Sequence, residues 1–139
     1  MKSSNLLKLV LLASGLIAIG IGSAILVAPA NFYATYGIEL TGDASLASEI
    51  RAPGGALLAM GLLMLAGVFV AEFAFASTAI AAAVYLSYGL SRLVSMAIDG
   101  SPDGGLVAAA ALELAIGAIN LLALLRYRRT TQHSERQPG

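Results

Sequence analysis

Four long apolar stretches, separated by short polar segments, constrain this chain more than any other feature of its sequence. They cover residues 6–28, 52–71, 76–98 and 105–125. A helix rises 1.5 Å per residue, so each stretch spans roughly the 30 Å hydrocarbon core of a bilayer. The chain is 58% hydrophobic and only 12% charged, whereas soluble domains have about 25% charged residues. The sequence therefore predicts an all-α, four-helix transmembrane bundle.

The first apolar stretch has a second interpretation, as a secretory signal peptide. Lys2 and Lys8 resemble the basic start of such a peptide, and residues 28–30 resemble its cleavage site. Apolar cores of signal peptides are only about 7–15 residues long, so we expect a retained helix instead. Small residues repeat every four positions along it, which lets another helix approach closely; these are Ser14, Ala18 and Gly22.

The polar segments carry residues that end and begin helices. Pro29 should end the first helix, and residues 29–52 form the longest connection, with a short helical entry over 44–52. Pro53 predicts either a fresh helix start or a kink. Aromatic residues follow the first helix, as they do at membrane interfaces: Phe32, Tyr33 and Tyr36. Residues 1–127 are thus expected to form one four-span membrane domain, and 128–139 a polar tail.

The distribution of Lys and Arg predicts the orientation. Basic residues flank the first and last stretches, namely Lys2, Lys8, Arg126, Arg128, Arg129 and Arg136. The 29–52 connection and the 99–104 turn are mostly acidic. Both termini should therefore be cytoplasmic, with the acidic connections outside. Residues 52–61 resemble 101–110, which suggests two parallel helical hairpins, although chance similarity explains this equally well in a chain rich in Ala and Gly.

Two opposite charges interrupt the third and fourth stretches at a similar depth. Arg92 lies about 10 Å before Asp99, and Glu113 lies about 13 Å from the start of the fourth stretch. The turn between them makes the two helices antiparallel neighbours. An isolated charge near the bilayer centre costs at least about 2.5–3.5 kcal/mol, so Arg92 and Glu113 should pair.

Other polar residues are expected near this pair, in the outer half of the bundle. The Arg92 guanidinium suits carboxylate or phosphate groups, and tyrosines on the same helix face supply flat walls. The candidate ligand-binding residues are Glu49, Arg51, Tyr85, Tyr88, Arg92, Asp99, Glu113 and Asn120. The same cluster is also consistent with ion pairs that only fix helix packing, and a proton-coupled site is a third interpretation.

Several classes of function find no support in the sequence. The chain has no cysteine, which excludes thiol redox chemistry, disulfides and thiolate metal sites. No metal-ligand spacing surrounds His133, and no phosphate-binding loop motif is present. We expect no cofactor, no metal and no nucleic-acid partner, and we identify no catalytic residues, so an enzyme is poorly motivated.

Three motifs resemble those of a known family. They are Glu49-Ile-Arg51-Ala-Pro53-Gly54-Gly55, then Tyr88-Gly-Leu-Ser-Arg92, then Asp99-Gly100-Ser-Pro102 with Glu113 beyond it. Over residues 5–127 the chain resembles the small bacterial membrane proteins known as domain of unknown function 4345, and more remotely it is similar to DoxX-like proteins. The resemblance implies a bacterial four-helix membrane bundle and no known activity.

Together these observations predict a multi-pass protein of the bacterial inner membrane. Its expected partners are the lipid bilayer and a small polar or amphipathic molecule, or a lipid, bound at the polar cluster. A second copy of the chain or a membrane-complex protein is a further possible partner. The alternative function is a structural or assembly subunit of a membrane complex, whose buried ion pairs only fix helix packing. A proton-coupled transporter or a membrane enzyme is the second alternative.

Overall fold

The computed structural model describes residues 4–135, and within them the chain is helical with no β-strand. The predicted all-α, four-helix class is confirmed. Four helices are long and apolar enough to cross a membrane. The elements in chain order are α1 (Asn5–Val27), α2 (Pro29–Ala34), α3 (Ala44–Phe69), η1 (Ala71–Phe73), α4 (Ala74–Asp99) and α5 (Gly104–Glu135).

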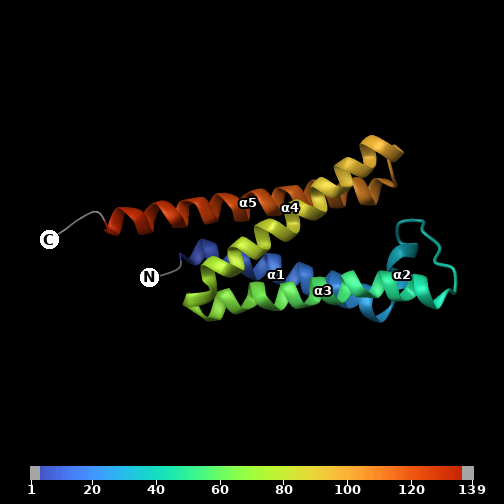
Figure 1. Cartoon of the computed structure of the whole chain (residues 1–139), viewed down its shortest axis with the longest axis horizontal. Helices are drawn as coiled ribbons and strands as arrows, with labels where there is room; N and C mark the ends of the chain where they lie inside the picture. The colour runs from blue at the N-terminus through green and yellow to red at the C-terminus, as the bar shows by residue number, and fades with distance from the viewer. Residues whose placement is uncertain (1–3, 136–139) are drawn as a thin grey trace.

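The four long helices form two antiparallel pairs, α1 with α3 and α4 with α5, and the two pairs have the same orientation in the bundle. α1 packs mainly on α3, α4 packs mainly on α5, and α3 joins the two pairs by packing on α4. Figure 1 shows α2 and the α4–α5 turn at one end of the bundle, and the start of α1 and η1 at the other. We call the first of these the α2 end. The arrangement agrees with the two parallel hairpins that the sequence suggests.

Side-chain caps and Pro29 set the limits of α1. The Ser4 hydroxyl accepts a hydrogen bond from the backbone N–H of Leu7 at 3.2 Å, which satisfies one of the unpaired donors of the first turn. Pro29 starts the short helix α2 directly after α1, where the absence of a proline N–H does no harm. The chain therefore changes direction at Ala28 and folds α2 over the end of the bundle.

Pro53 lies inside a continuous α3 rather than at its start. The helix begins at Ala44, where Asp43 accepts hydrogen bonds from the N–H groups of the first turn. The predicted second span at 52–71 thus begins eight residues too late and merges with the predicted entry over 44–52. A proline removes one intrahelical bond to the carbonyl four residues earlier. That carbonyl belongs to Glu49, on an exposed part of the helix, so the helix continues.

The other two connections are short. η1 connects α3 to α4, so α4 begins at Ala74, two residues before the predicted position. Gly100 ends α4 with a φ of 94°, a conformation that glycine adopts without the steric penalty of a side chain. α5 extends to Glu135, beyond the predicted end at 125, because residues 126–135 contain no Gly or Pro to stop it. The end of the predicted polar tail, 136–139, lies outside the described residues.

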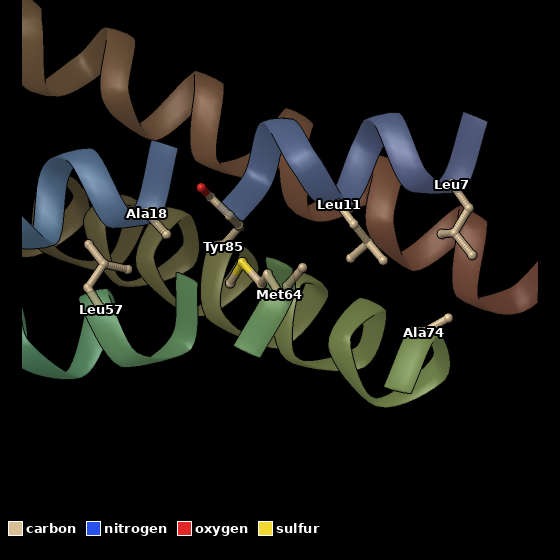
Figure 2. Close-up of a cluster of buried hydrophobic side chains, with 8 residues drawn as sticks. Leu7, Leu11, Ala18, Leu57, Met64, Ala74 and Tyr85 are labelled. Atoms are coloured by element: carbon tan, nitrogen blue, oxygen red, sulfur yellow. The ribbon is translucent and has the colours of Figure 1, made fainter. Parts of the chain in front are cut away.

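Close helix contacts form the centre of the bundle. Figure 2 shows the buried side chains that meet between α1, α3 and α4, among them Leu11, Met64 and Tyr85. Glycines allow backbones to touch at the α1–α3 contact: a Cβ on Gly22 would lie 2.6 Å from the backbone nitrogen of Leu58. Large apolar side chains on all four long helices are exposed. Exposed apolar surface of this extent is typical of a surface that faces lipid or another protein.

Candidate functional site

A cavity of about 210 Å³ lies at the α2 end of the bundle. All five α-helices contribute to it, and most of its wall is apolar or aromatic. Its lining residues are Ile17, Ala18, Ile21 and Ile25 of α1; Phe32 and Tyr33 of α2 with Tyr36 just after it; Pro53 and Leu57 of α3; Val84, Tyr85, Tyr88 and Arg92 of α4; and Leu106, Ala109, Leu112 and Glu113 of α5. A concave apolar site with few polar groups is the usual form of a small-molecule pocket.

Arg92 and Glu113 form the predicted ion pair on one wall of the cavity. Nε of Arg92 donates to Oε2 of Glu113 at 2.8 Å, and Nη2 donates to Oε1 at 3.1 Å. This two-point geometry fixes both side chains, since the planar guanidinium matches the carboxylate. The side chains are 32% and 14% exposed, respectively. The pair therefore joins α4 to α5 while part of the guanidinium still faces the cavity.

Tyr85 and Tyr88 line the cavity together with Arg92 of the same helix, and their role in ligand binding stays a prediction. The Tyr85 hydroxyl donates to the backbone carbonyl of Ser14 at 2.6 Å, so its ring is held against α1 (Figure 2). Tyr88 is half-buried between Tyr85 and the ion pair along the helix. These two rings form a flat wall. The Tyr85 ring is fixed by its hydrogen bond to Ser14, and the Tyr88 ring lies one helical turn before Arg92.

Aromatic residues of the first connection form the roof of the cavity. The Phe32 ring packs edge-on against Tyr33, at 5.4 Å between centroids, and against Tyr36, at 5.6 Å. Tyr36 also lies against the start of α5, where a Cβ on Gly105 would be 3.1 Å from its ring. The sequence indicated interfacial aromatics here and did not place them at the site. Only the abrupt Pro29 turn signals that this segment folds back.

Asn120 is fully buried and lies two helical turns beyond Glu113 on α5. Its Nδ2 donates to the Ser14 hydroxyl and to the Ile116 carbonyl, both at 2.9 Å. Its Oδ1 is buried and has no hydrogen-bond partner among the side chains described, those of residues 4–127. Asn120 does not line the cavity. It is linked to the cavity wall through Ser14, which accepts a hydrogen bond from Asn120 on its hydroxyl and one from Tyr85 on its carbonyl.

Three predicted residues lie apart from the ion pair. Glu49 and Arg51 are exposed on α3, and Nε of Arg51 donates to the Leu26 carbonyl at 3.0 Å. Arg51 therefore caps the last turn of α1, where carbonyls have no intrahelical partner. Asp99 accepts from the Ser95 hydroxyl at 3.1 Å at the exposed end of α4. Of the predicted residues, the ion pair and the two tyrosines of α4 line the cavity. Glu49, Arg51 and Asp99 do not line it, and their role in ligand binding stays a prediction.

The arrangement combines an apolar cleft with one neutral ion pair and several tyrosine hydroxyls. Such a site is suited to holding an apolar molecule and orienting it through a few hydrogen bonds. The tyrosine rings add flat surfaces against which a planar group stacks.

Comparisons with known proteins place the whole bundle in one family. The family profile described as domain of unknown function (DUF4345) matches residues 6–124, which include the lining residues of the cavity. No curated protein and no solved structure gives a significant match. The remote similarity to DoxX-like proteins stays a prediction.

Proposed function

The chain belongs to the DUF4345 family, and we propose that it is a multi-pass protein of the bacterial inner membrane that binds a small amphipathic molecule or lipid. The proposed site is the cavity at the α2 end, in the outer half of the membrane. The apolar, exposed surface of the four long helices supports a location within the bilayer. The position of the Arg92–Glu113 pair on the cavity wall is the observation that carries the binding proposal.

The cavity has the size and chemistry of a ligand site. A cavity of about 150 Å³ accommodates benzene, so about 210 Å³ accommodates a somewhat larger group. Ion pairs that serve only to fix helix packing do not require an open space beside them. Here the pair forms one side of a pocket whose other sides are apolar and aromatic.

A pair of substitutions on α5 tests this proposal. Ala109 lines the cavity and is half-buried, so Ala109→Phe should fill it while leaving Arg92 and Glu113 in place. Ala108 is its exposed neighbour, and Ala108→Phe is the matched control. Each protein is purified in mild detergent, and its organic extract is analysed by mass spectrometry.

We expect the unmodified protein and Ala108→Phe to carry the same low-mass molecule at a fixed molar ratio, and Ala109→Phe to lose it. Circular dichroism and gel filtration would verify that both variants retain the helical bundle. A molecule that remains in Ala109→Phe, or the absence of any molecule from the unmodified protein, would contradict the proposal.

A structural role is the second candidate function, and the two-point contact between α4 and α5 favours it. The chain would then serve as a subunit of a membrane complex, with its ion pair fixing the shape that the partner recognises. Pull-down from native membranes in mild detergent should in that case recover one partner at a constant ratio. Recovery of only the monomer or a homodimer counts against it.

A further inference from the structure

The cavity wall has an excess of hydrogen-bond donors. A guanidinium carries five N–H groups, and Arg92 uses one on Nε and one on Nη2 for Glu113. Among the side chains that the structure describes, residues 4–127, Nη1 of Arg92 makes no hydrogen bond, and neither do the hydroxyls of Tyr33, Tyr36 and Tyr88. These four side chains line the same cavity. A bound molecule is thus met by several free donors on the cavity wall.

The charge of the site disfavours an ionic ligand. Arg92 and Glu113 neutralise each other, and no other lining residue of the cavity is charged at neutral pH. An added carboxylate or phosphate would lie beside the Glu113 carboxylate without a cation of its own. In a medium of low dielectric constant, such an unpaired charge is strongly disfavoured. An added ammonium group would likewise lie beside the positively charged guanidinium without an anion of its own.

The remainder of the cavity favours an apolar and flat body. Aliphatic side chains of α1 and α5 line the cavity, including Ile21, Ile25 and Leu112. The rings of Phe32 and Tyr88 also line it, and the Phe32 ring packs edge-on against Tyr33 and Tyr36. Aromatic walls of this kind favour planar groups through offset or edge-on contacts.

We propose that the ligand carries an uncharged hydrogen-bond acceptor of the carbonyl class at one end of an apolar, largely planar body. The acceptor oxygen takes a hydrogen bond from Nη1 of Arg92 and one from a tyrosine hydroxyl, with Tyr88 nearest along the helix. This inference rests on the proposed function, because it specifies the ligand of the same cavity.

Three probes of one size test the ligand class. They are para-fluoroacetophenone, which has the carbonyl; para-fluoro-α-methylstyrene, which replaces the carbonyl oxygen with a methylene group; and para-fluorobenzoate, which adds a negative charge. Fluorine NMR line broadening is measured with the full chain in detergent micelles, and the broadening in empty micelles is subtracted. A hydrogen bond to a charged donor predicts at least about tenfold tighter binding of the ketone than of the styrene. The benzoate should show no excess broadening.

Two variants test whether the side chains of the cavity wall cause the preference for the ketone over the styrene. Tyr88→Phe keeps the ring and removes one donor, so it should weaken ketone binding about threefold and leave styrene binding unchanged. The double variant Arg92→Leu/Glu113→Leu keeps the tyrosine hydroxyls, so it should reduce the tenfold preference for the ketone to about threefold. If the double variant does not fold, Tyr88→Phe and the three-probe comparison in the unmodified chain still decide the matter.

The outcomes separate this inference from the proposed function. Equal binding of ketone and styrene to the unmodified chain, or tighter binding of the benzoate, overturns the carbonyl inference while the cavity is still a binding site. Binding that Ala109→Phe leaves intact, or no probe bound beyond the micelle background, overturns both. Ala108→Phe should bind all three probes as the unmodified chain does.

Discussion

Arg92 and Glu113 illustrate how much a single pair of residues determines in this protein. Each charge on its own would be unfavourable among apolar helices, yet together they form a two-point contact between α4 and α5. The pair could be predicted because depth along a helix follows from residue number, and because the turn at Gly100 makes the two helices neighbours. The same reasoning placed Tyr85 and Tyr88 on the face that lines the cavity.

Removing one member of this pair should be more harmful than removing both. Arg92→Leu leaves Glu113 charged and only 14% exposed, so we expect the free energy of unfolding to fall by about 2 kcal/mol, below the range for fully buried pairs because Arg92 is partly exposed. The double variant Arg92→Leu/Glu113→Leu should lie within about 1 kcal/mol of the unmodified protein. Unfolding by SDS in mixed micelles, followed by circular dichroism, measures both.

Lys8→Leu is the control for the loss of a basic residue. Lys8 is exposed on α1, and its substitution should change the free energy of unfolding by no more than about 0.5 kcal/mol. If Arg92→Leu is as mild as Lys8→Leu, the ion pair does not stabilise the bundle.

Other residues of the site could not be assigned from the sequence, for physical reasons. Arg51 was expected near the ion pair because both lie toward the same end of the bundle. Its side chain instead donates a hydrogen bond to the Leu26 carbonyl. Tyr33 and Tyr36 become lining residues because α2 folds over the bundle, a tertiary arrangement that residue spacing does not encode. Asn120 shares a helix face with Glu113, yet the contact between α1 and α5 makes Ser14 its partner.

At the scale of the elements, the α1–α3 pair depends on glycines in register. Gly15 and Gly22 of α1 meet Gly61 and Gly54 of α3 so closely that an added Cβ would lie within about 3 Å of the opposite backbone or side chains. Helices in lipid associate largely through such close packing. The repeat of small residues in α1 indicated this contact, but the sequence alone did not identify α3 as the partner.

Gly22→Ala should separate these two helices. The new Cβ would lie 2.6 Å from the Leu58 nitrogen and 2.7 Å from the Gly54 carbonyl oxygen, and a backbone cannot yield as a flexible side chain does. We expect a loss of about 1–3 kcal/mol in the free energy of unfolding. Gly20→Ala is the matched control on the same helix, because nothing lies within 4 Å of its added Cβ. Equal stability of the two variants in the same SDS titration would show that close packing at Gly22 is not required.

The limits of the helices were harder to predict than their number. Pro53 suggested a start or a kink. It does not start the helix, because the cap at Asp43 and the exposed position of Glu49 allow α3 to begin at Ala44 and include Pro53. Beyond residue 125, polar composition suggested a tail, yet helix formation depends on backbone compatibility as well as on burial. A run without Gly or Pro therefore continues α5 to Glu135.

At the scale of the whole molecule, the two parallel hairpins place both acidic connections at the α2 end (Figure 1). Residues 35–43 and 100–103 lie there, whereas η1 lies at the opposite end with the start of α1. The excess of Lys and Arg at the ends of the chain predicts that η1 faces the cytoplasm and that the cavity opens toward the outer leaflet. This predicted orientation determines which leaflet would supply the proposed ligand.

Single cysteines can test the orientation, because the natural chain has none. Gly42→Cys and Ser101→Cys place thiols in exposed positions at the α2 end, and Glu72→Cys places one in exposed η1. A maleimide that does not cross the inner membrane should label the first two in intact spheroplasts, and should label Glu72→Cys only after the membrane is disrupted. The opposite pattern would move the α2 roof and the cavity to the inner leaflet and reverse the route by which a ligand enters. Labelling at both ends without disruption would contradict a membrane-spanning bundle, because its two ends must lie on different sides of the bilayer.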